Sequence, residues 1–143
     1  DADFSPQRPA RHPRGLTPWR TFLLWHRTQL LAPVCSRAAP PEQLAQLDAA
    51  YRFTGTANGE IAMRWYPLAL RSGYLEARPA AGEFIERVGR RKLIMPIYQE
   101  LVKTPDGLAF AHEAFARARP GYHPITTASV EAMIAKAEAA PKQ

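Results

Sequence analysis

The sequence has only one cysteine, Cys35, among its 143 residues. A single cysteine cannot form a disulfide within the chain, so nothing here indicates an oxidising compartment. No motif around Cys35 marks it as a nucleophile, and we expect an inert thiol in a cytoplasmic protein. No apolar stretch is long enough to cross a bilayer, so we expect no membrane partner.

Catalytic motifs are also lacking. A zinc peptidase needs two histidines one helical turn apart with a glutamate as base, but the nearest match, HEAFA from His112 to Ala116, has no second histidine. His12, His26 and His123 have no ligand-like spacing. No glycine-rich phosphate loop and no serine elbow occur. We therefore expect no metal site, cofactor or catalytic residue in this chain.

No segment shows the sustained alternation of a strand, whereas apolar residues recur at helical spacing throughout. With 46% hydrophobic residues the chain can bury a core. We predict an all-α fold of about six or seven helices, packed as antiparallel pairs in a two-layer, armadillo-like superhelix. Residues 1–16 are rich in proline and arginine and predict an extended arm. Residues 17–143 predict a single helical domain.

Helix boundaries are marked by caps and stops. Thr17, Asn58 and Thr104 are expected N-caps. Gly73, Gly89 and Pro120-Gly121 are expected to end helices. Three prolines fall within helical patterns: Pro67 predicts a kink, Pro79 a kink or a late helix start, and Pro96 lies in the first turn or so of its helix. The buried faces are expected to include Leu44, Leu47, Tyr51, Ile61, Trp65, Leu68, Leu75, Phe84, Ile85, Val88, Leu93, Ile97, Leu101, Leu108, Ala111, Phe115, Ala118, Val130, Met133 and Ile134.

The formal net charge is +6, which permits nucleic acid, an acidic surface or a small anion as partner. Arg90, Arg91 and Lys92 stand in a row where a helix is expected to begin, in GRRKLIMPIYQEL. Cations are disfavoured at that end of a helix. Two interpretations remain open. The cluster is either a solvated face, with Arg87 pairing Glu83 and Lys92 reaching acids such as Glu100, or a site for an anion.

The second interpretation gives Arg90 and Lys92 a specific chemistry. Free backbone N–H groups at a helix start add to the field of nearby cations. Arginine can hold a carboxylate through two parallel hydrogen bonds, and lysine can add a point charge. A single carboxylate or phosphate would fit such a site. A long nucleic acid would require cations spread along a face with interleaved aromatic residues, which the sequence does not clearly show.

Three segments carry a resemblance to a known family: LDAAYRFTGTANGEIAMRWYPLALRSGY, GRRKLIMPIYQELVKTPDG and ARPGYHPI. Together they resemble the C-terminal helical domain of leukotriene A(4) hydrolase and its bacterial aminopeptidase relatives, over about residues 41–130. The motifs are Asn-x-Glu-Ile-x-x-Arg-Trp from Asn58, Gly-Arg-x-Lys from Gly89, and His123-Pro124, in the family's order.

The resemblance implies a short armadillo-like superhelix that closes one wall of a peptide cleft. It implies that Arg90 and Lys92 bind the free carboxylate of a short peptide substrate, while Arg91, at the variable position, points elsewhere. Zinc and a glutamate base would belong to an upstream catalytic domain of the same polypeptide, a zinc aminopeptidase. The chain lacks an initial methionine, and we expect it to be a piece of that protein, inactive alone. The alternative is a freestanding basic helical module that binds a protein or nucleic acid.

Overall fold

The helices follow one another with short connections in the computed structural model, which describes residues 39–139 of the chain. The expected arm at residues 1–16, the helix expected after Thr17, and Cys35 lie outside the described residues. The α-helices are α2 (Pro41–Tyr51), α3 (Gly59–Arg71), α4 (Arg78–Arg87), α5 (Arg91–Leu101), α6 (Pro105–Ala118) and α7 (Pro124–Ala139), with two 3₁₀ turns, η1 (Leu75–Ala77) and η2 (Arg119–Gly121).

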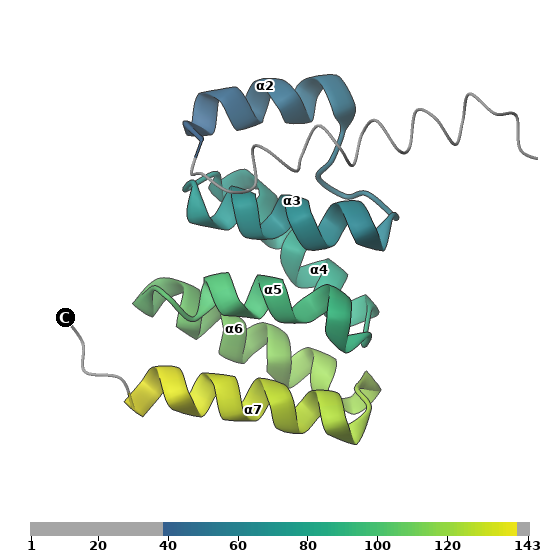
Figure 1. Cartoon of the computed structure of the whole chain (residues 1–143), viewed down its shortest axis with the longest axis vertical. Helices are drawn as coiled ribbons and strands as arrows, with labels where there is room; N and C mark the ends of the chain where they lie inside the picture. The colour runs from purple at the N-terminus through teal and green to yellow at the C-terminus, as the bar shows by residue number, and fades with distance from the viewer. Residues whose placement is uncertain (1–38, 140–143) are drawn as a thin grey trace, which may run out of the picture.

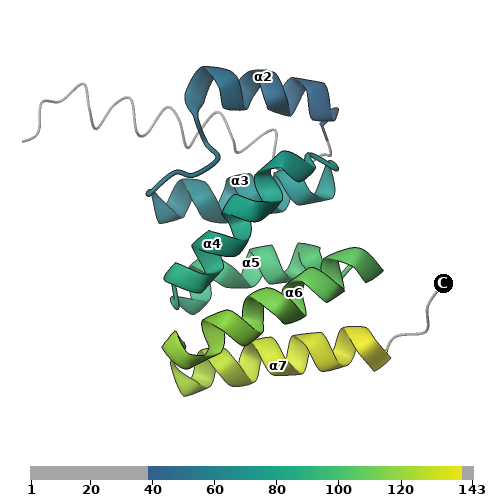
Figure 2. The same cartoon turned by 180° about the vertical axis from the view of Figure 1, so that it is seen from behind.

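These helices form two layers. Helices α3, α5 and α7 lie side by side in one layer (Figure 1), and α4 and α6 cover them from behind (Figure 2). Helix α2 lies beyond α3 at one end of the stack. No strand occurs between residues 39 and 139, so the all-α two-layer prediction is confirmed, with six α-helices in this part of the chain. Within the same range, no helix combines the length and apolar character needed to span a membrane.

The core lies between the layers and is built from the predicted faces. Trp65, Tyr66, Phe84 and Tyr98 are its largest fully buried side chains. Most of the expected apolar positions are buried, while Leu47, Tyr51, Val88, Leu108 and Met133 are partly buried against the core. The expectation for Leu75 was wrong, because this residue, in the turn before α4, is 58% exposed. Tyr98 and Tyr122 place their hydroxyls 3.3 Å apart, and the Tyr122 hydroxyl donates to the Ile85 carbonyl at 2.6 Å. This bond ties the connection before α7 to the end of α4.

The predicted caps begin two helices. Asn58 Oδ1 accepts the backbone N–H groups of Glu60 and Ile61, at 3.0 and 3.4 Å. Thr104 Oγ1 accepts that of Gly107 at 3.1 Å. Gly73 has φ of 74°, the left-handed conformation that glycine adopts most readily after a helix. Sequence capping rules therefore located both helix starts correctly.

The three prolines behave differently from one another. Pro79 lies in the first turn of α4, so the late start is confirmed. Pro67 lies inside α3, which continues to Arg71, so this proline does not end the helix. Pro96 is the sixth residue of α5, because that helix begins already at Arg91. The expectation that Pro96 lies in the first turn was therefore wrong: it occupies the second turn, where its missing N–H leaves the Lys92 carbonyl without the usual helical partner.

Helices α3, α5 and α7 run in the same direction, so their N-termini share one edge of the molecule (Figure 1, right side). Contacts at their first residues confirm this arrangement. A Cβ atom on Gly59 at the start of α3 would lie 2.7 Å from Leu93 of α5. Thr126, near the start of α7, donates its hydroxyl to the Gly89 carbonyl at 3.5 Å. The partial positive charges of three helix ends therefore gather at this edge.

Candidate functional site

The connection before α5 passes close to the connection before α7. A Cβ atom on Gly89 would lie 3.2 Å from the Gly121 carbonyl oxygen and 3.4 Å from the Tyr122 ring. A larger residue would push the two connections apart. Helix α4 itself ends at Arg87, two residues before the expected stop at Gly89. The function of Gly89 is therefore to permit this close approach, which fixes where α5 begins.

Helix α5 begins with Arg90 in the N-cap position. Unlike Asn58 and Thr104, Arg90 makes no side-chain capping bond, and α5 has no acid in its first turn. The first backbone N–H groups that bond within the helix are those of Leu93 and Ile94, which donate to the Arg90 carbonyl. The N–H groups of Arg91 and Lys92 precede them and point out of the helix end.

The predicted site residues Arg90 and Lys92 are both exposed at this edge. Lys92 Nζ donates to Glu60 Oε1 at 2.9 Å. The hydrogen bond from Lys92 lowers the pKa of the Glu60 carboxyl, and the charges of Lys92, Arg64 and Arg90 lower it further. Arg90 is therefore close enough to act on the same carboxylate that binds Lys92. Arg91 is also exposed, at the first position of the helix.

The ion pairs that the solvated-face interpretation predicted for Arg87 and Lys92 are not present in the described part of the chain. Lys92 does not reach Glu100, because Glu100 is eight positions further along α5, which corresponds to roughly 12 Å. Glu100 instead contacts Arg71 at 3.7 Å and Lys103 at 2.8 Å. Among the ion pairs of residues 39–139 none joins Arg87 to Glu83. Sequence reasoning missed Glu60, although it belongs to the Asn-x-Glu motif, because that partner lies on another helix.

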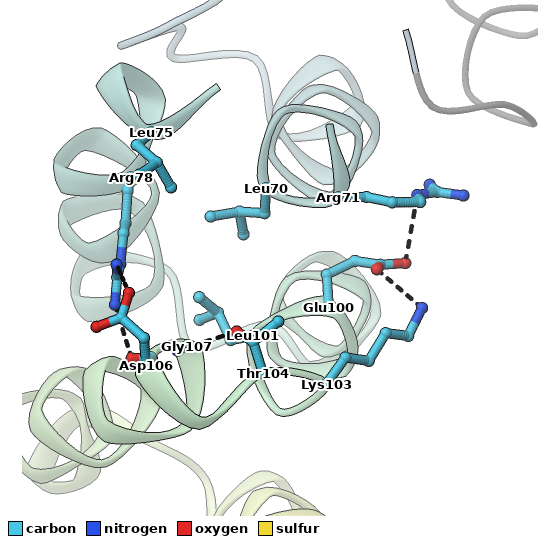
Figure 3. A pocket seen from close by; sticks show the side chains of 10 residues that line it. All are labelled: Leu70, Arg71, Leu75, Arg78, Glu100, Leu101, Lys103, Thr104, Asp106 and Gly107. Carbon is cyan, nitrogen blue, oxygen red and sulfur yellow. Dashed lines mark hydrogen bonds and ion pairs between the residues drawn. The ribbon is translucent and has the colours of Figure 1, made fainter. Parts of the chain in front are cut away.

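A pocket of about 180 Å³ lies at the opposite end of α5, between the ends of α3 and α5 and the starts of α4 and α6 (Figure 3). Its apolar lining includes Leu70, Leu75 and Leu101, and its charged side chains are Arg71, Arg78, Glu100, Lys103 and Asp106.

Those charged groups are largely satisfied by one another. Arg78 donates to the Asp106 carboxylate and, at 2.8 Å, to its backbone carbonyl (Figure 3). Glu100 is shared by two cations. The pocket therefore has no clear excess of positive or negative charge, whereas the start of α5 has an excess of positive charge. We place the candidate site at the start of α5, away from this pocket.

The described residues hold no group of three or more His, Cys, Asp or Glu side chains arranged to bind a metal. His112 Nε2 lies 2.9 Å from Glu138 Oε1, across from α6 to α7. His123 Nδ1 accepts the backbone N–H of Ile125 at 3.3 Å, at the start of α7. Both histidines thus contribute to helix packing and helix ends. His12 and His26 lie outside the described residues.

Many of the positively charged residues are paired with acids instead of forming one continuous basic surface. Six cations of the described residues belong to ion pairs with carboxylates: Arg71, Arg78, Lys92, Lys103, Arg117 and Arg119. Most of the aromatic residues between residues 39 and 139 are in the core, and the partly buried Phe110 contacts Arg78, which pairs with Asp106. A nucleic-acid surface would need both features on an exposed face.

The fold and this edge define an all-α, two-layer superhelical domain with a cationic helix start. The chain belongs to the family described as leukotriene A(4) hydrolase, C-terminal, whose model matches residues 25–134. The match begins earlier in the chain than the resemblance over residues 41–130 suggested.

Fungal proteins named leucine aminopeptidase 2 are similar to this chain. The Lodderomyces elongisporus protein is 38% identical over 79 residues, which is 55% of this chain and 12% of that protein. The Neurospora crassa protein is 32% identical over 99 residues, 69% of this chain and 14% of that protein. The Aspergillus oryzae protein is 28% identical over 131 residues, 92% of this chain and 20% of that protein. The chain thus spans a fifth or less of these relatives.

Proposed function

We propose that this domain binds the free C-terminal carboxylate of a short peptide at the start of α5, through Arg90 and Lys92. The observation that carries the proposal is the pair of exposed cations at a helix start that lacks a side-chain cap and an acid of its own. The N-termini of α3 and α7 lie at the same edge and add to its positive field.

The chemistry of the two side chains is complementary. The guanidinium of Arg90 can form two parallel hydrogen bonds to a carboxylate, which fixes its orientation. The ammonium of Lys92 has three donors and uses one for Glu60, so two remain. The outward N–H groups of the first turn of α5 can complete the coordination of the anion.

The parent protein, in this proposal, is a cytoplasmic zinc aminopeptidase whose cleft is closed on one side by this domain. The zinc ion would polarise the peptide carbonyl and activate water, and its ligands and the glutamate base belong to a catalytic domain of the same polypeptide. The contribution of this domain is to position the peptide substrate. Holding the far end of a peptide sets how far its amino end reaches, so remote binding energy is used for orientation at the scissile bond.

Binding of acetyl-trialanine to the chain tests the carboxylate site, with acetyl-trialanine amide as the matched probe. We expect backbone NMR shifts at residues 89–93 with the acid and none with the amide. Arg90→Ala should weaken binding about tenfold or more, because hydrogen bonds between charged groups contribute roughly 1.5–3 kcal/mol. Arg91→Ala, which removes the same charge one residue away, should change it much less. Equal shifts with both probes, or equal losses in both variants, would refute the assignment.

The same titration with single-stranded and duplex oligonucleotides tests the alternative of a freestanding basic module. Affinity that falls steeply with salt and depends on many lysines and arginines would favour that alternative. The pairing of cations with carboxylates along the domain argues against this alternative.

A further inference from the structure

We propose that Glu60 is a positioning residue for Lys92, and that the carboxylate site consists of two cations and this acid. The inference rests on the proposed function, and it adds a residue from a different helix. Glu60 Oε1 accepts a hydrogen bond of 2.9 Å from Lys92 Nζ, although the two residues are 32 positions apart in the chain.

The backbone of Glu60 is held in place. Asn58 caps α3 and accepts the Glu60 backbone N–H at 3.0 Å. Gly59, between them, lies against Leu93 of α5, so closely that even a Cβ atom there would be 2.7 Å from the leucine. The starts of α3 and α5 are therefore packed together. A carboxylate mounted on this contact gives the flexible lysine side chain a fixed point.

A lysine without such a partner would be a poor component of a binding site. Its four-carbon stem has many rotamers, and ordering such a long side chain costs side-chain entropy. The Lys92 side chain is 60% exposed, so packing alone does not order it. The hydrogen bond to Glu60 provides that order before a ligand arrives, and it leaves two ammonium donors available.

A simpler role for Glu60 is possible, because an acid in the first turn of a helix is stabilising by itself. The two roles respond differently to Glu60→Asp. Aspartate keeps the charge and the favourable place in α3, but its side chain is one methylene shorter and cannot make the same contact with Lys92. A purely electrostatic role predicts no change in carboxylate binding, or stronger binding when the negative charge is removed. The positioning role predicts weaker binding in Glu60→Asp and in Glu60→Ala, because both variants lose the contact with Lys92.

The experiment measures acetyl-trialanine affinity and the NMR signal of the Lys92 ammonium in the same set of variants. We expect Glu60→Asp and Glu60→Ala to weaken binding about three- to tenfold. The Lys92 ammonium should become more mobile in the free protein. Glu60→Gln keeps the length and an acceptor oxygen, and should retain most of the affinity. Glu138→Ala removes an acid of similar exposure at the far end of α7 and serves as the control, which should bind as the parent chain does.

The outcomes separate this inference from the proposed function. Binding that depends on Arg90 but is unchanged or stronger in Glu60→Asp and Glu60→Ala would overturn the positioning role and leave the carboxylate site standing. An unaltered Lys92 signal in both variants would also overturn it. No binding of the acid by the parent chain would overturn the proposed function and this inference together.

Discussion

Replacement of Arg90 by asparagine should make the domain more stable while it weakens carboxylate binding. The backbone is already suited to a cap, because Arg90 has φ of −77° and ψ of 110°, and Asn58, which does cap its helix, has −82° and 110°. An asparagine N-cap contributes about 1 kcal/mol. Removal of an exposed cation from a helix N-terminus adds about 0.3–1 kcal/mol. The sum is a gain of about 1–2 kcal/mol.

Urea denaturation monitored by circular dichroism measures this change, and thermal unfolding should show a rise of about 5–10 °C for a domain of this size. Asn58→Ala is the control in the opposite direction. It removes the same kind of cap from α3 and should lower the free energy of unfolding by about 1 kcal/mol. The reasoning fails if Arg90→Asn lowers the midpoint while Asn58→Ala behaves as expected. Arg90 would then be stabilising the domain, and its place at the helix start would need no ligand to explain it.

Two further predictions concern the packing of the helices in this domain. Gly107→Ala should destabilise by about 1–3 kcal/mol despite the better helix propensity of alanine, because the new Cβ would lie 2.2 Å from the Leu101 carbonyl oxygen. Gly82→Ala, whose Cβ would meet only the movable ring of Phe110 at 2.9 Å, should cost less than 1 kcal/mol in the same urea titration, and equal losses would contradict this account. Burial and the neighbouring Asp48 carboxylate raise the pKa of Tyr74 to about 12. Stability contributed by its neutral hydroxyl should therefore be complete below pH 10 and be lost as the pH rises through 12, a loss that Tyr74→Phe should reduce in alkaline unfolding curves.

Local signals in the sequence were sufficient for the helices. Asn58 and Thr104 accept backbone N–H groups within three residues of themselves, so their capping role can be predicted without knowledge of the tertiary fold. Pro96 shows the limit of such reasoning. A proline is most easily accommodated in the first turn, but α5 begins five residues before it and is held by the burial of Leu93 and Ile97. Tertiary packing outweighs the missing hydrogen bond there.

The partner of Lys92 could not be predicted in the same way. From the sequence alone, the acids that a lysine could reach were sought along its own helix, and this led to Glu100, eight positions away, rather than Glu60. The pair with Glu60 requires that α3 and α5 lie side by side in the same direction, with their first turns level. That arrangement follows from the two-layer packing with α4 between them in sequence. The residue types of the motif indicated an anion site, but the geometry of the site depends on the fold.

Because α3 and α5 run in the same direction, positive charge is favourable at one edge of this domain and unfavourable at the other. Arg71 is in the last turn of α3 and Lys103 follows the end of α5, at the edge where the helix dipoles favour positive charge, and both contact Glu100. Their placement is explained by stability alone. Arg90 and Lys92 lie at the other edge, against the dipoles, and within the described residues Glu60 forms an ion pair with Lys92 but not with Arg90. Arg90 should therefore lower stability at a position whose backbone would accept a cap, and the carboxylate ligand proposed above would make this placement favourable.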